Sequence, residues 1–204
     1  MKNIVYGLLS TSSIAPRFLA AVRAVDGGEV LALSSRSLEK AQDLAQQWQI
    51  PVAYGSHEEL LADERINTVY ISTINSLHYH WAVRALEMGK NVICEKPCTT
   101  TPEDTRALFA LAQEKGLFLM EAEKMLFLPA LLEVRRQIQE GNLGQIHMVQ
   151  LSHSFPASYN NWMFDEKSGA ARCCPAASMR CSLSIGCSGK LPKSGGRGVF
   201  WIPG

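Results

Sequence analysis

The chain has 204 residues, of which 47% are hydrophobic and 19% are charged, as expected for a globular protein with a sizeable apolar core. Residues 1–167 carry 15 basic and 19 acidic side chains, which gives no electrostatic basis for binding nucleic acid. No apolar run approaches the roughly 20 residues that a membrane span needs. The apolar N-terminus has no convincing signal-peptide cleavage site, so we expect a cytoplasmic protein.

Strand-like and helix-like segments alternate along most of the chain. Apolar β-rich runs predict strands, and apolar residues three or four positions apart predict helices. The expected strands cover residues 3–9, 29–34, 50–54, 68–73, 91–94, 117–122 and 146–155; the expected helices cover 14–25, 37–47, 56–62, 77–88, 101–115 and 129–140. Repeated βα units with short connections predict an α/β fold, with a parallel sheet covered by helices on both faces.

Several residues predict where these helices begin, and which face of the first helix is buried. Ser37, Ser56 and Thr101 are the expected N-caps, with a capping box over 56–59 and a proline and two acids after Thr101. On the first helix, the apolar spacing predicts a buried face that comprises Ile14, Phe18, Ala21, Val22 and Val25.

A tight turn connects the first expected strand to the first helix. Its Ser10, Ser12 and Ala15 stand where a G-x-G-x-x-G/A dinucleotide loop has its glycines. Small residues let the backbone approach a pyrophosphate, and a helix N-terminus offers unpaired N–H groups. An ordinary strand-to-helix turn is the alternative. The cofactor-binding residues predicted here are Ser10, Thr11, Ser12, Ser13 and Ile14.

The second expected strand ends in Ser35-Arg36-Ser37. An NAD site usually places an acid here for the ribose 2′-hydroxyl, whereas a guanidinium flanked by hydroxyl groups suits a 2′-phosphate. We therefore predict that Ser35 and Arg36 bind NADP(H), with NAD(H) as the alternative cofactor. A solvated Arg36 before an ordinary helix is the structural alternative.

Polar residues also follow the fourth expected strand, beside the strand that leads to Lys96. Thr73, Asn75 and His78 are predicted to contact the cofactor, the last two at the nicotinamide ribose or ring. A histidine near a helix start often caps or packs instead, and this alternative stays open for His78.

The strand over 91–94 ends directly in Glu95-Lys96-Pro97. Proline has no N–H for a ladder and disfavours helix at the residue before it, so the chain turns out of the sheet at Lys96. Ligands of open parallel sheets bind at the carboxyl ends of the strands. We predict that Glu95, Lys96 and Pro97 contact the cofactor; a solvated Glu-Lys pair before a turn is the alternative.

In their order and spacing, these segments resemble the Gfo/Idh/MocA family of NAD(P)-dependent oxidoreductases, in particular the branch of dihydrodiol dehydrogenases and NADP-dependent xylose dehydrogenases. The similarity covers about residues 1–167. The motifs that carry it are Gly7 to Ala15, Ser35-Arg36-Ser37, Asn75-x-x-His78, Ala85 to Val92, Glu95-Lys96-Pro97, Phe118 to Ala122, Phe127 to Ala130 and Gly141-Asn142-Leu143-Gly144.

The resemblance implies a fold and a chemistry. It implies a doubly wound Rossmann domain over 1–122, followed over 123–167 by the start of an α+β domain that binds substrate and forms homo-oligomers. It implies hydride transfer between NADP and a secondary alcohol of a sugar or diol, with Lys96 and Glu95 as the catalytic pair. Lys96 stabilises the developing alkoxide or relays its proton, Glu95 orients Lys96, and a cis Pro97 fixes the direction of the lysine.

Residues 168–204 depart from the family and form an aberrant tail, expected to be disordered. They contain four of the six cysteines, seven of the 15 glycines and no acid. The cysteine spacing fits no zinc pattern, so no metal site is predicted. A shifted reading frame over 170–181 permits a glycine-rich segment with a tyrosine that resembles the family, so a frameshift is our hypothesis for this tail.

Truncation of the second domain predicts impaired turnover. A non-catalytic nucleotide-binding or sensor module is the alternative function, and an interaction protein with a basic docking tail is a further one. The sequence leaves open the substrate, the oligomeric state and whether the tail is genuine.

Overall fold

The computed structural model describes residues 4–146, and the chain divides into two compact units that meet between Ala122 and Glu123. The first unit contains, in order, β1 (Ile4–Leu9), α1 (Ala15–Arg23), β2 (Gly28–Ser34), α2 (Leu38–Trp48), β3 (Val52–Tyr54), α3 (His57–Ala62), β4 (Thr68–Ile71), α4 (Asn75–Glu87), β5 (Asn91–Cys94), α5 (Pro102–Glu114) and β6 (Leu119–Glu121). The described part of the second unit holds a 3-10 turn, η1 (Lys124–Phe127), and α6 (Pro129–Gln139). The expected strand over 146–155 and the tail over 168–204 lie outside the described residues.

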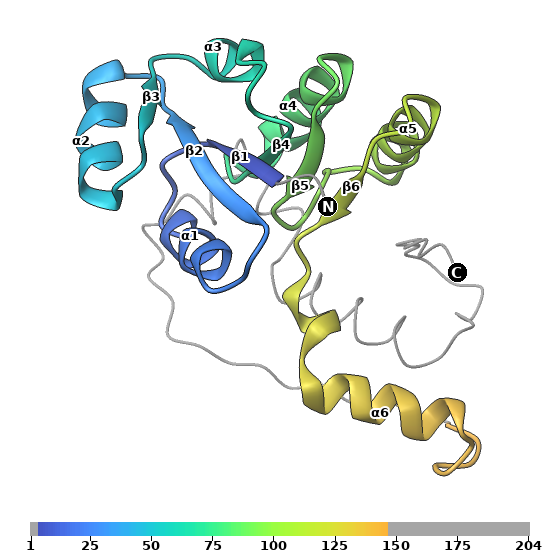
Figure 1. Cartoon of the computed structure of the whole chain (residues 1–204). Coiled ribbons are helices and arrows are strands. Elements are labelled where there is room, and N and C mark those ends of the chain that lie inside the picture. Colours follow the sequence, from blue (N-terminus) through green and yellow to red (C-terminus); the bar gives the residue numbers. More distant parts are fainter. Residues whose placement is uncertain (1–3, 147–204) are drawn as a thin grey trace, which may run out of the picture. The chain divides into compact units, whose positions relative to one another are not determined.

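The first unit is a six-stranded parallel sheet in the order β3-β2-β1-β4-β5-β6. Helices α1 and α2 lie on one face of the sheet, and α3, α4 and α5 lie on the other (Figure 1). Their buried residues form two separate core clusters, one on each face. This is the strand order of a doubly wound Rossmann domain, so the predicted fold of the first unit is confirmed.

The predicted N-caps are confirmed. The hydroxyl oxygens of Ser37, Ser56 and Thr101 accept hydrogen bonds from backbone amides three residues later, at 3.3, 3.1 and 3.1 Å. The capping box differs in one detail, because the Glu59 carboxylate accepts from the amide of Gly55 rather than that of Ser56. Each cap satisfies an amide that the first helical turn leaves unpaired.

The predicted buried face of α1 is wrong for two of its residues. Val25 is 65% exposed and Ala21 is also exposed. Because α1 begins at Ala15 and ends at Arg23, its buried stripe follows Ala15, Leu19 and Val22. Val25 lies beyond the helix end, so helical spacing no longer determines which way its side chain points.

Other element ends differ from the expected bounds where the local backbone stops pairing. β3 begins two residues later than expected, because Gln49 takes a left-handed conformation and Pro51 has no N–H for the ladder. β4 ends at Ile71 and α4 begins at Asn75, two residues earlier than expected. The connection between β4 and α4 keeps its expected length. It lies against the end of β1, where the amide of Ser72 donates to the carbonyl of Leu9.

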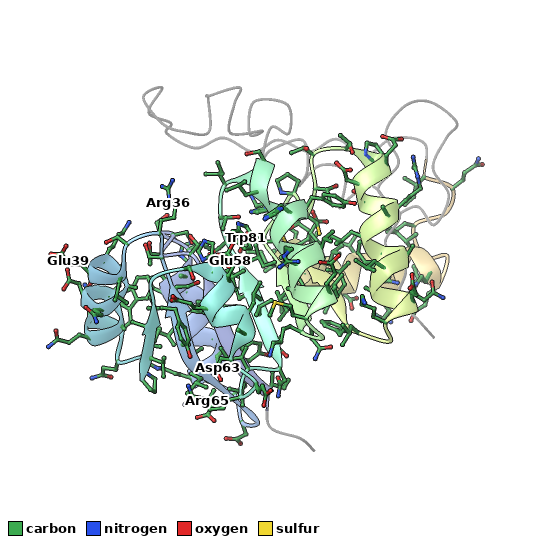
Figure 2. All side chains as sticks on the ribbon, turned by 90° about the horizontal axis from the view of Figure 1, so that it is seen from above. Arg36, Glu39, Glu58, Asp63, Arg65 and Trp81 are labelled. Carbon is green, nitrogen blue, oxygen red and sulfur yellow. The ribbon has the colours of Figure 1, made fainter. Side chains whose placement is uncertain are left out.

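Hydrogen bonds and an ion pair hold the connection between α3 and β4. The buried ammonium of Lys90 donates to the backbone carbonyls of Asp63 and Ile66, both at 2.8 Å. The Asp63 carboxylate pairs with Arg65 and accepts from the Tyr54 hydroxyl at 2.9 Å. Figure 2 shows Asp63 and Arg65 at the end of the sheet opposite to Arg36. These bonds stabilise the amino edge of the sheet, away from the predicted cofactor residues.

Candidate functional site

Strand register brings the predicted cofactor residues to one edge of the sheet. Leu9 at the end of β1 pairs with Ser34 at the end of β2 and with Ile71 at the end of β4, and Ile71 pairs with Cys94 at the end of β5. The segments that follow these residues, 10–14, 35–37, 72–75 and 95–97, therefore leave the same carboxyl edge next to one another (Figure 1). In an open α/β sheet this edge is where ligands bind.

The turn after β1 has the backbone of a glycine loop without its glycines. Ser10 has a φ of 124°, in the left-handed region that favours glycine, and it stands where the first glycine of the fingerprint is expected. No side chain caps α1 at Ile14, and the amides of Ser13 and Ile14 donate to no acceptor among residues 4–146. These amides are the donors that a pyrophosphate at a helix N-terminus accepts from.

A serine pair ties this turn to the end of β4. The hydroxyl of Ser12 donates to that of Ser72, with 2.8 Å between the oxygens. Thr11 lies half-buried between Ser10 and Ser12, and Ser13 is exposed. The turn is thus held against the neighbouring strand end without using the amides of Ser13 and Ile14.

Arg36 is exposed directly after β2, and its side chain makes no ion pair or hydrogen bond with residues 4–146. Figure 2 shows it pointing outward from the sheet. The preceding Ser35 is buried, and its amide donates to the carbonyl of Tyr54 at 3.2 Å. The backbone before Arg36 is therefore fixed, whereas its guanidinium is available to an anion.

The structure also shows a polar pair that the sequence did not single out. The hydroxyl of Ser34 lies 2.7 Å from Nδ1 of His57, and the His57 ring stands edge-on to Trp81 with 4.8 Å between centroids. His57 was expected only as part of the capping box over 56–59. A histidine one position after a serine cap has no spacing that marks it, so sequence reasoning had no signal for this contact.

After β4, two of the three predicted residues, Asn75 and His78, are buried, whereas Thr73 is half-buried. His78 is 1% exposed, and its ring nitrogens lie 2.7 Å from the carbonyl oxygen of Pro97 and 3.0 Å from that of Thr73. Asn75 is 5% exposed. His78 thus connects the start of α4 to the turn that carries Lys96. Its contact with the cofactor stays a prediction, as do those of Thr73 and Asn75.

Burial lowers the pKa of His78, while the carbonyls of Pro97 and Thr73 and the charge of Glu95 raise it. A neutral imidazole has one N–H and can donate to only one of the two carbonyls, whereas an imidazolium donates to both. The side chain therefore positions the turn most firmly when it is protonated.

Lys96 leaves β5 half-buried, and the Lys96–Pro97 peptide bond is cis, as predicted. No carboxylate among residues 4–146 lies within ion-pair distance of its ammonium. The Glu95 carboxylate instead accepts the hydroxyl of Tyr70 at 2.6 Å and the amide of Lys96 at 3.4 Å. Glu95 thus holds the backbone at Lys96, and the ammonium has no counter-ion in the part of the chain that the structure describes.

Tyr70 of β4 is a positioning residue that sequence reasoning missed. Its ring is 2% exposed and stacks on Phe18 of α1 at 3.9 Å between centroids. Burial raises the pKa of Tyr70 well above its ordinary value, and the Glu95 carboxylate raises it further. The hydroxyl therefore remains a proton donor to Glu95 at any physiological pH.

The far side of the Lys96 turn is held by an acid of β6. The amide of Cys98 donates to the Glu121 carboxylate at 2.8 Å, and the buried Cys94 thiol faces the carbonyl of Cys98. Both of these cysteines are free thiols. The segment 95–98 is thus bonded to β4, α4 and β6 at once.

Within residues 4–146, no cluster of three or more histidine, cysteine or acidic residues could hold a metal ion, and no helix is long and apolar enough to cross a membrane. The polar groups at the carboxyl edge are instead a left-handed turn, a serine pair, and helix amides and two cations that have no partner within the described part of the chain. This donor set fits a dinucleotide with its phosphates, and it defines a dinucleotide-binding Rossmann domain.

Comparison with known families identifies the chain further. Residues 4–123 match the family model described as "Oxidoreductase family, NAD-binding Rossmann fold". The chain belongs to this Gfo/Idh/MocA family, as the resemblance of its motifs predicted.

Similar proteins include trans-1,2-dihydrobenzene-1,2-diol dehydrogenase of Xenopus laevis, 36% identical over 154 residues, which are 74% of this chain and 46% of that protein. D-xylose 1-dehydrogenase (NADP(+)) 2 of Haloferax volcanii is 35% identical over 152 residues, with the same shares covered. A 3-ketoreductase from Actinomadura kijaniata, solved as a mutant with NADP and TDP-benzene, aligns with a TM-score of 0.65 and 34% identity over 71% of this chain and 45% of that one. The chain thus spans about half the length of the relatives it matches.

Proposed function

We propose that residues 4–122 bind NADP(H) along the carboxyl edge of the sheet, as the nucleotide domain of a sugar or diol dehydrogenase. The observation that carries this proposal is the common edge of four strand ends, from which the free amides before α1, Arg36 and Lys96 all emerge. The named relatives that act on diols and on xylose with NADP support it.

Different residues of this edge are proposed to contact different parts of the cofactor. The amides of Ser13 and Ile14 are placed for the pyrophosphate, and Ser35 and Arg36 for the 2′-phosphate. Lys96, bonded into its turn by Glu95, Pro97 and Cys98, is placed for the nicotinamide end, since β5 lies on the opposite side of β1 from β2. NAD(H) is the alternative cofactor, and its binding requires no contact from Arg36.

The nicotinamide, when bound, supplies hydride chemistry. The task of Lys96 is electrostatic: its ammonium has no carboxylate partner among residues 4–146, so its charge can act on a substrate oxygen. A cation beside a secondary alcohol stabilises the alkoxide that develops as hydride leaves. Glu95 and Tyr70 hold the backbone of Lys96 in place, and neither forms an ion pair with its ammonium.

Titration with NADPH and with NADH, followed by cofactor fluorescence, tests the proposal. We expect NADPH to bind more tightly, and Arg36→Ala to lower its affinity about tenfold or more while NADH affinity stays the same, since one charge-assisted phosphate contact contributes about 1.5–3 kcal/mol. Arg17→Ala, an exposed arginine on α1, is the matched control. Equal affinity for the two cofactors would contradict the assignment of NADP(H).

A nucleotide-binding module without catalysis is the second candidate, because the chain covers only 46% of its dehydrogenase relatives. Lys96→Ala separates the two functions. A dehydrogenase loses turnover and keeps cofactor binding, whereas a binding module has no turnover to lose. A cytoplasmic location, and the formation of homo-oligomers by full-length family members, stay predictions.

A further inference from the structure

His57 lies at the same edge as Arg36 and has no role in the site described so far. It is the first residue of α3, and Tyr54 at the end of β3 accepts the amide of Ser35, so the turn that carries Arg36 lies next to the start of α3. Ser34, directly before that turn, holds Nδ1 of His57 at 2.7 Å. The imidazole is thus fixed to the strand from which Arg36 emerges.

One nitrogen of this imidazole is free. Ser34 occupies Nδ1, whereas Nε2 has no hydrogen-bond partner among residues 4–146. Trp81 of α4 contacts the ring edge-on, and a water-exposed His80 contacts Trp81 in turn. The ring is therefore held in place by two neighbours while Nε2 can still bind a ligand.

Three features of the surroundings control protonation of His57. Burial lowers its pKa below the ordinary value, the Glu58 carboxylate of its own helix raises it, and the Arg36 charge lowers it again. Ser34 of β2 and Trp81 of α4 are uncharged. A free Arg36 thus disfavours a second positive charge at His57, and an anion beside Arg36 removes that penalty.

We propose that His57 is a specificity-determining residue for the 2′-phosphate, adding a second, pH-dependent positive charge beside that of Arg36. This inference rests on the proposed function. A 2′-phosphate carries a charge of about −1.5 to −2 near neutral pH, so it favours the protonated imidazole. NADH has a hydroxyl at that position and gains nothing from the charge. The preference for NADPH over NADH therefore depends on the proton of His57.

The sign of the pH dependence follows from linkage. Binding of the 2′-phosphate raises the pKa of His57, so the protein takes up a proton when NADPH binds near neutral pH. The phosphate itself has a pKa of about 6, and the Arg36 cation lowers it on binding, which releases a proton. Without His57, lowering the pH protonates the free phosphate and so weakens NADPH binding. With His57, lowering the pH also protonates the imidazole, which strengthens binding and offsets part of that loss.

Affinities of the 204-residue chain for NADPH and NADH at about pH 6 and about pH 8 test the inference, because these values lie on either side of an ordinary histidine pKa. We expect the wild-type preference for NADPH to exceed that of His57→Gln several-fold at the lower pH, because a rise of one unit in the pKa of His57 strengthens binding by about tenfold at most, and only where the free imidazole is already protonated. At the higher pH the two proteins are expected to agree. His80→Gln, which removes an exposed imidazole on the other side of Trp81, should behave as wild type.

A second measurement needs no variant. The pKa of His57 is followed by NMR on the wild-type chain with 2′,5′-ADP and with 5′-AMP, which differ in the 2′-phosphate. We expect 2′,5′-ADP to raise the pKa and 5′-AMP to leave it unchanged. Calorimetry in two buffers of different ionisation enthalpy should show more proton uptake for wild type than for His57→Gln.

The outcomes separate this inference from the proposed function. If NADPH is preferred through Arg36 but wild type and His57→Gln show the same pH dependence, the role of His57 is refuted and the cofactor assignment stands. If 2′,5′-ADP leaves the His57 pKa unchanged although it binds, the role is refuted as well. If NADPH is preferred at neither pH, the proposed function fails and the inference fails with it.

Discussion

Ser10 holds a backbone conformation that residues with a side chain rarely adopt. Its φ of 124° is strained for serine and ordinary for glycine, and such positions cost about 1–3 kcal/mol. Ser10→Gly relieves this strain and adds about 0.5–1 kcal/mol of chain entropy to the unfolded state. We expect a net rise of about 1 kcal/mol in the free energy of unfolding, measured by urea denaturation.

Ser13→Gly is the matched control for this substitution. Ser13 lies in the same turn and is exposed, but its φ is not positive. Glycine there gains no relief of strain and only makes the unfolded chain more flexible, so we expect a small loss of stability. If Ser10→Gly destabilises the chain as much as Ser13→Gly does, Ser10 is not strained.

The sequence predicted which residues lie at the carboxyl edge of the sheet, but it did not predict the residues that hydrogen-bond to them. Glu95-Lys96-Pro97 stands out because an acid, a base and a proline follow a buried strand. Tyr70 bonds Glu95 from the neighbouring strand, 25 positions earlier in the chain, and nothing in the spacing of β4 marks it. Contacts of this kind depend on strand register, which is fixed only when the sheet assembles.

Lys90 fastens two elements that are distant in the chain. It precedes β5, is 7% exposed, and donates to the carbonyls of Asp63 and Ile66 ahead of β4. Lys90→Met keeps much of the apolar stem and leaves both carbonyls without this donor. We expect a loss of about 2–4 kcal/mol in the free energy of unfolding, since a buried polar group left unpaired costs about 1–3 kcal/mol.

Lys115→Met controls for the loss of a lysine charge near the end of a helix. Lys115 is exposed and its side chain bonds to no residue in 4–146, so its replacement should change stability by no more than about 0.5 kcal/mol. Chemical denaturation of both variants gives the comparison. Equal effects would show that the two bonds of Lys90 contribute nothing.

At the level of whole elements, apolar period and caps were sufficient to predict the order of strands and helices in the first unit. The errors concern where individual helices and strands begin or end and which face of a helix is buried. Val25 fits the helical period of α1 yet follows its last residue, and Pro51 fits an apolar run yet cannot enter the ladder. Both errors arise because period is a property of several residues together, whereas an end depends on a single backbone N–H or φ angle.

The whole molecule joins a well-packed nucleotide domain to a second unit of which η1 and α6 are the described elements. α6 has no buried residue, and Leu132 and Val134 on it are 46% and 39% exposed. A helix of 11 residues is marginal unless an apolar face packs on other elements. The relatives extend to about twice the length that this chain matches.

This division predicts that the 204-residue chain binds NADPH but turns over little or no substrate. Positioning an alcohol against the cofactor contributes about 7–11 kcal/mol to such reactions, so we expect most of the rate to be lost, even with Lys96 in place, if residues 168–204 do not complete the substrate domain. NADPH formation from D-xylose and from dihydrodiols, measured by absorbance beside the binding titration, checks this. Turnover at the level of an intact relative, abolished by Lys96→Ala, would contradict it.

The DNA encoding residues 169–187 provides a second, independent test of the same prediction. If the tail results from a frameshift, correcting the frame should restore a family-like second domain, and turnover should rise by orders of magnitude while NADPH affinity changes little, because Arg36 and the turn before α1 are unaltered. Lys96→Ala in the corrected chain should abolish that gain. An intact frame with no insertion or deletion would instead make the tail genuine, and the nucleotide-binding module would become the better description of this chain.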